Sequence, residues 1–406
     1  MTADASALPS RRNILRLVAG GAAATGLPGC DLPDRGPPVP LGSTAKATVL
    51  GIENERFFPA SGAGALEAEF MAAIQTQMSA RGVRSPADLP KLRFLAVSGG
   101  GENGAFGAGL LCGWTAQGTR PVFDLVTGVS TGALTAPFAF LGPEYDSQLR
   151  AVYTETNANE ILSKRRILAA VFSDAMADNE PLYRTISKYL DERMIRAITA
   201  AYDSGRLLFI ASTDLDAQVP VIWNVGAIAK SGHPKAVETI RRILLASAAI
   251  PGAFPPTMLD VTMDGRPYQE MHVDGGAFAQ AFLYPPALTE KRLERKRRGL
   301  PVVEASTYVI RNGRLDPEWA KVERRTLGIA GRAISTMITA SGYNDVIRIY
   351  NTTQRDGIDY NLAYIGRDFD KELTEPFESG YMRALFQYGY QKAVSGYDWA
   401  TKPPMI

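Results

Sequence analysis

Apolar runs and glycine-rich turns alternate along the middle of the chain, and their spacing predicts an order of strands and helices. Residues 93–98 form a short apolar run that is followed by three glycines, and residues 103–118 are small and apolar residues that favour a helix. Residues 123–129 form a second apolar run, and residues 131–141 again have helical spacing. This β-α-β-α order predicts an α/β fold with a parallel sheet and right-handed crossovers.

Similar patterns continue on both sides of this unit. Residues 66–78 have apolar positions at helical spacing before the first strand. Further strands are predicted at 206–213, 219–225, 268–273 and 306–311, and further helices at 235–250, 318–341 and 381–395. Because no segment between residues 46 and 406 has the composition of an interdomain linker, we expect one domain over this range.

The N-terminal residues have a different character. Arg11 and Arg12 precede a mildly apolar run at residues 17–28, which ends just before Cys30. This arrangement resembles a twin-arginine export signal that runs into a lipoprotein signal-peptidase site. The resemblance implies that residues 1–29 are removed, that Cys30 is acylated, and that the protein is anchored at the periplasmic face of a membrane.

Residues 30–45 are rich in proline and glycine, which predicts a flexible tether between the lipid anchor and the folded body. Removal of residues 1–29 takes three arginines and one aspartate from totals of 44 basic and 42 acidic residues, which leaves 41 of each. A neutral chain gives no reason to expect nucleic acid as a partner. The second cysteine, Cys112, would remain without a disulfide partner.

The first candidate for chemistry is Ser130, in the sequence Gly128-Val129-Ser130-Thr131-Gly132. This G-x-S-x-G pattern stands between a predicted strand and a predicted helix, which is where a nucleophile elbow has to be. The elbow needs Gly128 and Gly132 because side chains there would collide with the neighbouring backbone. We therefore predict that Ser130 is a nucleophile, although the same glycines could also shape an ordinary β-α turn.

The second candidate is the glycine-rich sequence of residues 99–104, again in a strand-to-helix turn. As G-x-G-x-x-G it fits a dinucleotide-binding turn, with Asp124 as the ribose-binding acid. As an oxyanion loop, it would offer backbone amides to the tetrahedral intermediate of acyl transfer. A dinucleotide site does not need a second turn with G-x-S-x-G, so the sequence favours the oxyanion loop. The residues predicted to form it are Gly99, Gly100, Gly101 and Gly104.

A serine nucleophile also needs a base, and the chain contains only two histidines, His233 and His272. Asp274 is a further candidate, because Gly275 and Gly276 let the chain turn after it and leave its carboxylate at the edge of the sheet. The residues alone leave a Ser-His-Asp esterase open. No cluster of side chains has metal-ligand spacing, so neither a metal nor another cofactor is predicted.

Taken together and in this order, residues 99–104, residues 128–132 and Asp274-Gly275-Gly276 resemble the three signature blocks of patatin-like phospholipases. Residues 213–216 and 248–256 also resemble that family, so the similarity extends over about residues 92–290. The resemblance implies a three-layer α/β/α fold with a mostly parallel central sheet.

The same resemblance implies a lipid acyl hydrolase of the phospholipase A, lysophospholipase or esterase type. Its substrate would be a phospholipid or another acyl-ester lipid, and its base would be Asp274, without a histidine. The alternative is an inactive lipoprotein that binds acyl lipids. Because a carboxylate is a weak base at neutral pH unless its pKa is raised, we expect Asp274 to lie in a partly desolvated position.

Two positions depart from the family pattern. Asn103 stands where many members have a basic residue, and Ser98 stands where they have an acidic one. The first departure removes a positive charge near the predicted oxyanion loop but leaves its backbone amides in place.

Overall fold

The computed structural model describes residues 35–59, 62, 64–156, 163–164, 177–284 and 286–404. The predicted signal peptide at residues 1–29, the predicted lipidation site Cys30 and the first residues of the predicted tether lie outside this part of the chain.

A nine-stranded sheet forms the centre of the structure. Five neighbouring strands are parallel, in the order β11 (Asp359–Tyr364), β10 (Ala305–Arg311), β2 (Leu92–Val97), β3 (Leu125–Val129) and β6 (Leu207–Asp214). The antiparallel strands are β7 (Val219–Asn224), which pairs with β6 and with β1 (Arg56–Phe57), and β9 (Arg266–Asp274), which pairs with β6 and with β8 (Thr257–Met263). The mostly parallel sheet agrees with the predicted fold class.

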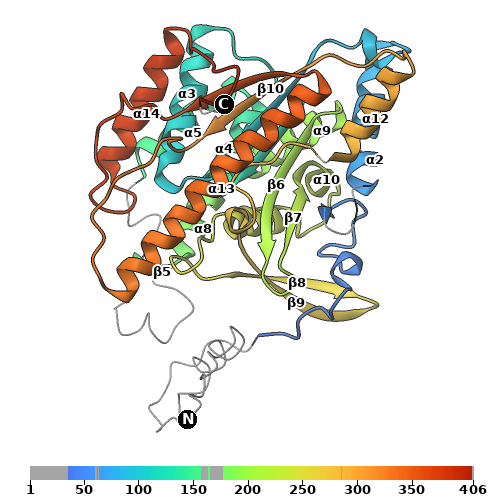
Figure 1. The fold of residues 1–406 in the computed structure, drawn as a ribbon. Helices are drawn as coiled ribbons and strands as arrows, with labels where there is room; N and C mark the ends of the chain where they lie inside the picture. The colour runs from blue at the N-terminus through green and yellow to red at the C-terminus, as the bar shows by residue number, and fades with distance from the viewer. Residues whose placement is uncertain are drawn as a thin grey trace, which may run out of the picture.

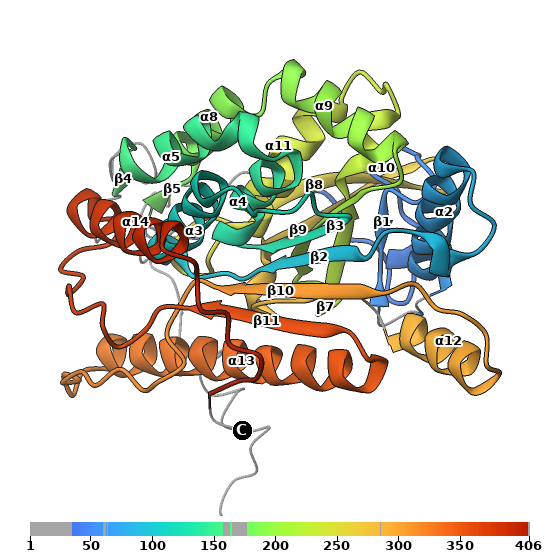
Figure 2. The same cartoon turned by 90° about the horizontal axis from the view of Figure 1, so that it is seen from above.

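Helices cover both faces of this sheet (Figures 1 and 2). One face is covered by α3 (Gly104–Gln117), α4 (Thr131–Leu141), α5 (Asp146–Thr154), α8 (Glu180–Tyr189), α9 (Glu192–Asp203), α10 (Val225–Lys230), α11 (Ala236–Ser247) and α14 (Ser379–Val394). The other face is covered by α2 (Gly64–Arg81), α12 (Pro286–Arg297) and α13 (Thr326–Asp356). A small hairpin pairs β4 (Ser163–Lys164) with β5 (Ala177–Asp178). This is the predicted three-layer α/β/α arrangement.

The parallel strands are recognisable in the sequence because both of their faces are buried. Every residue of β6 is buried, as are all but one in β2, so these strands are nearly continuous apolar runs. Three strands of this sheet were not predicted, β1, β8 and β11, nor was the β4–β5 pair. β1 has only two residues, buried and exposed residues alternate in β8, and β11 mixes polar and apolar positions, so none of the three is a long apolar run.

The predicted helix at residues 318–341 is misplaced, since α13 begins at Thr326 and ends at Asp356. Glycine and β-branched residues after residue 341 lower the helix propensity, which is why the pattern seemed to end there. Val346 and Ile349 are buried against the sheet, and this packing extends the helix beyond its local preference.

The prediction of a flexible tether is wrong for its described part, residues 35–45. The Arg35 guanidinium forms an ion pair with Asp216 and donates a hydrogen bond of 3.0 Å to the carbonyl of Gln269. The Gln269 amide in turn donates to the carbonyl of Pro37, at 2.9 Å. Prolines suit an extended segment of this kind, which lies along β9 and needs few amide donors of its own. In the described part of the chain, no helix is both long and apolar enough to span a bilayer.

Candidate active site

Ser130 lies in the tight turn between β3 and α4, with φ of 56° and ψ of −127°. This conformation is strained for a residue with a side chain. A Cβ atom on Gly128 would lie 2.5 Å from the carbonyl oxygen of Gly132, and one on Gly132 would lie 2.2 Å from that of Val97. The Ser130 amide donates a hydrogen bond of 3.0 Å to the Ser247 hydroxyl. Close backbone packing and this buried bond hold the strained turn.

Asp274 is the last residue of β9 and reaches the carboxyl ends of the parallel strands because β9 pairs with β6. Its carboxylate accepts the Gly276 amide at 2.7 Å, and the Ser130 hydroxyl lies close enough to influence its pKa. Only 4% of Asp274 is exposed. Burial raises the pKa of Asp274 to about 7, and these two neighbours only partly oppose this effect. The carboxylate therefore meets the expectation of a desolvated base beside the serine.

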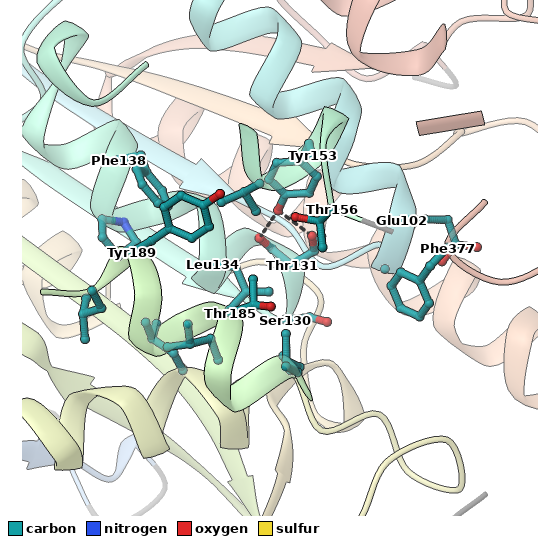
Figure 3. A pocket seen from close by; sticks show the side chains of 18 of the residues that line it. Glu102, Ser130, Thr131, Leu134, Phe138, Tyr153, Thr156, Thr185, Tyr189 and Phe377 are labelled. Atoms are coloured by element: carbon teal, nitrogen blue, oxygen red, sulfur yellow. Dashed lines mark hydrogen bonds between the residues drawn. The ribbon is translucent and has the colours of Figure 1, made fainter. Parts of the chain in front are cut away.

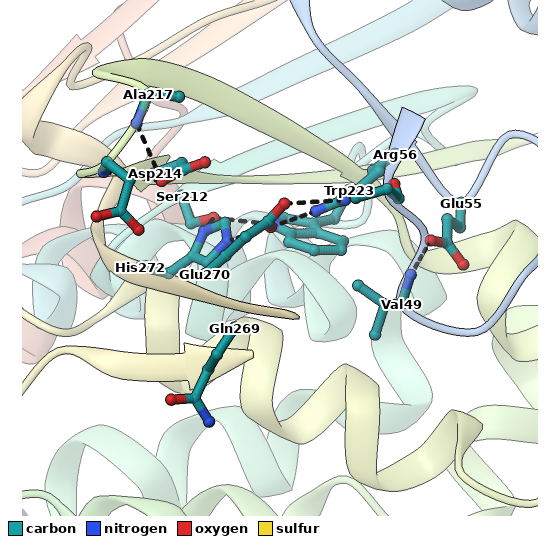
Figure 4. A network of polar contacts seen from close by, with 12 residues as sticks. Val49, Glu55, Arg56, Ser212, Asp214, Ala217, Trp223, Gln269, Glu270 and His272 are labelled. Atoms are coloured by element: carbon teal, nitrogen blue, oxygen red, sulfur yellow. Dashed lines mark hydrogen bonds and ion pairs between the residues drawn. The ribbon is translucent and has the colours of Figure 1, made fainter. Parts of the chain in front are cut away.

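Neither histidine is placed to act as the base. The Nδ1 and Nε2 atoms of His272 lie 3.0 Å from the Ser212 hydroxyl and 3.0 Å from a carboxylate oxygen of Glu270, respectively (Figure 4). His233 accepts the amide of Lys235 through Nδ1, at 3.1 Å. Within the described residues, neither imidazole forms a hydrogen bond with the nucleophile or its aspartate, so the geometry does not support a Ser-His-Asp triad.

The contacts of His272 belong to a buried polar network (Figure 4). Arg56 donates two hydrogen bonds to Glu270, at 2.6 and 3.1 Å, and the Trp223 indole donates to Ser212 at 2.8 Å. Burial alone would raise the pKa of Glu270, but the hydrogen bond from His272 and the charge of Arg56 lower it. Both ring nitrogens of His272 have partners within this network, which supports a structural role for this residue of β9.

The position of Asp124, the acid that a dinucleotide-binding site would use for the ribose, does not support that alternative. Asp124 directly precedes β3, so it lies at the end of the strand opposite to Ser130. Its carboxylate accepts the Arg93 amide at 2.7 Å and the Gln77 side chain at 3.0 Å. Asp124 therefore lies at the amino ends of the parallel strands, and the glycine loop lies at their carboxyl ends. The two cannot bind one nucleotide together.

The glycine loop presents fewer free amides than the sequence predicts. The Gly99 amide donates to the carbonyl of Gln280 at 3.0 Å, and the Gly104 amide donates to carbonyls within the short helical turn Gly101–Asn103. Those of Gly100 and Gly101 donate no hydrogen bond within the described part of the chain. The set of candidate oxyanion donors is therefore corrected from four amides to these two.

Two consecutive residues at the end of β10 fasten the start of this loop. Arg311 donates from Nη1 to the Ser98 hydroxyl at 3.3 Å and to the Gly99 carbonyl at 3.1 Å. Asn312 donates its amide to the Ser98 hydroxyl and its side-chain NH₂ to the Ser98 carbonyl, both at 2.9 Å. Because a trans peptide is planar, a Gly99 carbonyl that points at Arg311 directs the Gly100 amide to the opposite side.

Arg311 also brings a positive charge to the loop, which lacks a basic residue at position 103. Its side chain is 5% exposed and, among the described residues, forms no ion pair. Burial lowers the pKa of Arg311 to about 10, so it remains charged at neutral pH. Asn103 brings no charge to the loop; its side-chain oxygen accepts a hydrogen bond of 2.7 Å from the Tyr381 hydroxyl.

A pocket with a volume of about 80 Å³ opens at Ser130 (Figure 3). Its walls come mainly from α4, α5 and α8, and Phe254 and Phe377 also line it. Glu102 is the one acidic side chain in the lining, and burial raises its pKa. The apolar lining residues are Leu134, Pro137, Phe138, Val152, Leu182, Ile186, Leu190, Met194, Leu244, Ala248, Ile250, Phe254, Phe377 and Met382.

Comparison with known families gives one match. Residues 95–287 match the model of the patatin-like phospholipases. This region is similar to the patatin-like phospholipases, whose members are lipid acyl hydrolases. It contains Ser130, Asp274 and the whole glycine loop.

Two further comparisons complete the picture. VipD from Legionella pneumophila is similar in structure at 10% sequence identity and a TM-score of 0.36, over 77% of this chain and 68% of that chain. Among curated protein sequences, no significant match was found.

Several side chains that shape the patatin-like site were not predicted. Ser247 holds the elbow, and Asp345 accepts the amides of Gln280 and Ala281 at 2.7 and 3.2 Å. Arg311 carried a usable signal, because a charged residue at the carboxyl end of a predicted parallel strand is at the edge where such sites form. Ser247 and Asp345 lie within helices, and nothing in their local sequence marks them. Among the described residues, no group of three or more His, Cys, Asp or Glu is arranged to hold a metal ion.

The role of Arg311 can be tested by Arg311→Met. This change removes both hydrogen bonds to the loop and the charge behind it, so we expect kcat/KM for a soluble ester to fall by about tenfold to hundredfold. Arg206→Met is the matched control, because Arg206 is also a largely buried guanidinium that donates to two backbone carbonyls, those of Phe123 and Phe140, away from the site.

Both variants should lose about 1–3 kcal/mol of unfolding free energy in urea titrations, since each leaves buried carbonyls unsatisfied. Only Arg311→Met should lower kcat/KM per folded molecule. Equal activities in the two variants would show that Arg311 contributes to stability alone.

Proposed function

We propose that this protein is a serine lipid acyl hydrolase that cleaves carboxylic ester bonds through a Ser130–Asp274 dyad. The observation that carries the proposal is that the strained, elbow-bound Ser130 and the buried carboxylate of Asp274, with its raised pKa, lie together beside an apolar pocket. The similarity to the patatin-like phospholipases supports the same class of reaction.

In the first step, the Ser130 hydroxyl attacks the ester carbonyl while its proton passes to the Asp274 carboxylate. A new bond forms between Oγ and the carbonyl carbon, and the carbonyl oxygen becomes an oxyanion. The amides of Gly100 and Gly101 are free to donate to this oxyanion, and the N-terminus of α4 adds its dipole.

In the second step, the tetrahedral intermediate expels the alcohol, which takes the proton from Asp274 and leaves an acyl-serine. Water then attacks the acyl-serine, with Asp274 as the proton acceptor. Collapse of this second intermediate returns the proton to Ser130 and releases the fatty acid. The base of a dyad acts twice in this way, so its pKa must lie near the working pH.

The pocket supports an acyl chain as the group bound beside Ser130. Its walls are almost entirely aliphatic and aromatic, and transfer of each methylene from water to such walls contributes about 0.8 kcal/mol. Thr131 is fixed at the entrance by Tyr153, whose hydroxyl lies 2.7 Å from the Thr131 hydroxyl (Figure 3). A long-chain ester suits this lining better than a polar acyl group.

We also propose that the enzyme is exported and anchored at a membrane through acylated Cys30. The support is the sequence of residues 10–30, with its arginine pair and its cysteine after a short apolar run.

The dyad is tested by Ser130→Ala and Asp274→Asn. We expect Ser130→Ala to abolish labelling by a fluorophosphonate probe, and both variants to lower kcat for a short-chain ester by about 10³-fold or more. His233→Ala should keep full activity, and His272→Gln should keep kcat per folded molecule within about tenfold, because neither imidazole takes part in proton transfer. Full labelling of Ser130→Ala would refute the proposal, and a collapse of kcat in folded His272→Gln would restore the triad.

The raised pKa of Asp274 predicts a pH dependence. Below the pKa of about 7, the protonated carboxyl cannot accept the serine proton, so kcat/KM should fall about tenfold for each pH unit. Above it, kcat/KM should reach a plateau. The measurement is a pH profile with a soluble ester, with far-UV circular dichroism as the control for folding. A flat profile across the pKa would contradict the role of Asp274 as base.

The anchor is tested by Cys30→Ala in intact cells. The unmodified protein should incorporate a labelled fatty acid, and the variant should not, because its acceptor thiol has been removed. Cys112→Ala is the matched control and should be labelled like the unmodified protein. Equal labelling of Cys30→Ala would count against acylation at this residue.

A further inference from the structure

The N-terminal half of α13, residues 326–341, is unusual for a helix of a water-exposed surface. It contains a single charged residue, Arg332. Its exposed apolar side chains include Ile329, Ile334 and Met337, with 52%, 53% and 70% of their surface accessible. From residue 342 onward the same helix packs against the sheet, with Val346 and Ile349 in the core.

At 100° per residue, the two kinds of side chain fall on opposite halves of this segment. Ile329, Ala333, Met337 and Ile334 span one half of the helical circumference. Arg332, Ser335, Thr336 and Thr339 lie together on the other half. Arg332 donates to the carbonyl of Glu318, but the rest of the polar half, Ser335, Thr336 and Thr339, is exposed, as are Ile329, Ile334 and Met337. The apolar half of this segment is therefore not packed against the protein.

A surface helix usually turns its apolar stripe to the core, whereas the apolar stripe of this segment is exposed. Exposed apolar surface of this size generally marks a binding face. The segment that leads into the helix adds Trp319, which is 89% exposed, and the basic residues Lys321, Arg324 and Arg325. Tryptophan and basic residues next to an apolar helical face are typical of helices that lie in a membrane interface.

The helix is also attached directly to the catalytic edge of the sheet. Gly342 packs on the Arg311 guanidinium, which its Cβ would approach to 2.6 Å, and Asp345 accepts the amide of Gln280. Residues before Gly342 extend past the carboxyl ends of the parallel strands (Figure 2). Phe278, close after Asp274, is 56% exposed on the same edge. The apolar face thus lies at the carboxyl ends of the parallel strands, the same end at which Ser130 lies.

We propose that residues 319–341 form a docking face for a lipid surface that carries anionic headgroups. This inference deepens the proposed function and rests on it in one respect, namely that the surface on which the protein docks contains its ester substrate. Residues 317–341 contain four basic and two acidic side chains, and this net positive charge favours an anionic surface. The apolar half of the helix enters the interface, and the pocket opening faces the same lipids.

The test uses the full chain with Ser130→Ala and Cys30→Ala, so that neither hydrolysis nor an acyl anchor affects binding. Co-sedimentation is measured with phosphatidylglycerol–phosphatidylcholine vesicles. In this background we expect Ile334→Asp/Met337→Asp to weaken vesicle binding by about tenfold or more. Val122→Asp/Leu300→Asp is the matched control, because it places the same two charges on exposed apolar positions near the amino ends of the strands and should bind as the parent does.

With Ser130 restored, Ile334→Asp/Met337→Asp should hydrolyse a soluble short-chain ester at the parental rate but lose most of its activity on vesicles. Unchanged vesicle binding of this variant, or no binding by the parent, would overturn the docking face. So would a parental dimer that the variant converts to a monomer in light scattering, since the face would then cover a second copy of the chain. Vesicle binding without hydrolysis of either ester would refute the proposed function alone.

Discussion

The candidate site depends on how closely the backbone packs around Ser130. The turn between β3 and α4 is possible only because Gly128 and Gly132 let the helix approach the ends of β2 and β3. A serine in this conformation costs about 1–3 kcal/mol, and the surrounding structure must hold it there. The Ser247 hydroxyl accepts the Ser130 amide and itself donates to the Ala211 carbonyl at 2.6 Å, so α11 and β6 are tied to the elbow. The strain leaves the hydroxyl exposed to the pocket and pointed at Asp274.

Buried charge explains how the other groups are used. Asp274 lies among packed backbone without a cationic partner, so burial raises its pKa into the range where it can exchange a proton with serine. Glu270, four residues earlier, is in contrast fully paired with Arg56 and His272, which lowers its pKa. β9 therefore carries two buried carboxylates whose pKa values are shifted in opposite directions: the pKa of Glu270 is lowered, and that of Asp274 is raised to about 7. The hydrogen bonds of His272 go to Ser212 and Glu270 and not to Asp274.

The sequence allowed most of the catalytic edge to be predicted, because its elements are local. Ser130 and Asp274 each stand at a strand end marked by glycines, and buried parallel strands have an unmistakable apolar pattern. What could not be predicted depends on contacts between distant segments. The pairing of the Gly99 amide with Gln280 decides which glycines remain as donors, and no local pattern records it. The same holds for residues 35–45, whose prolines suggested a free tether although Arg35 pairs with Asp216.

The part of the chain beyond the family match completes the site. Arg311 and Asn312 lie at the end of β10, after residue 287, and together they set the direction of the Gly99 carbonyl. Gly342 of α13 leaves just enough room for that guanidinium, since a side chain there would displace it. The helix α13 thus contacts Arg311, the support of the glycine loop, at its middle, and its first half carries exposed apolar side chains. The same helix therefore connects the packing around the candidate site to an exposed apolar segment of the surface.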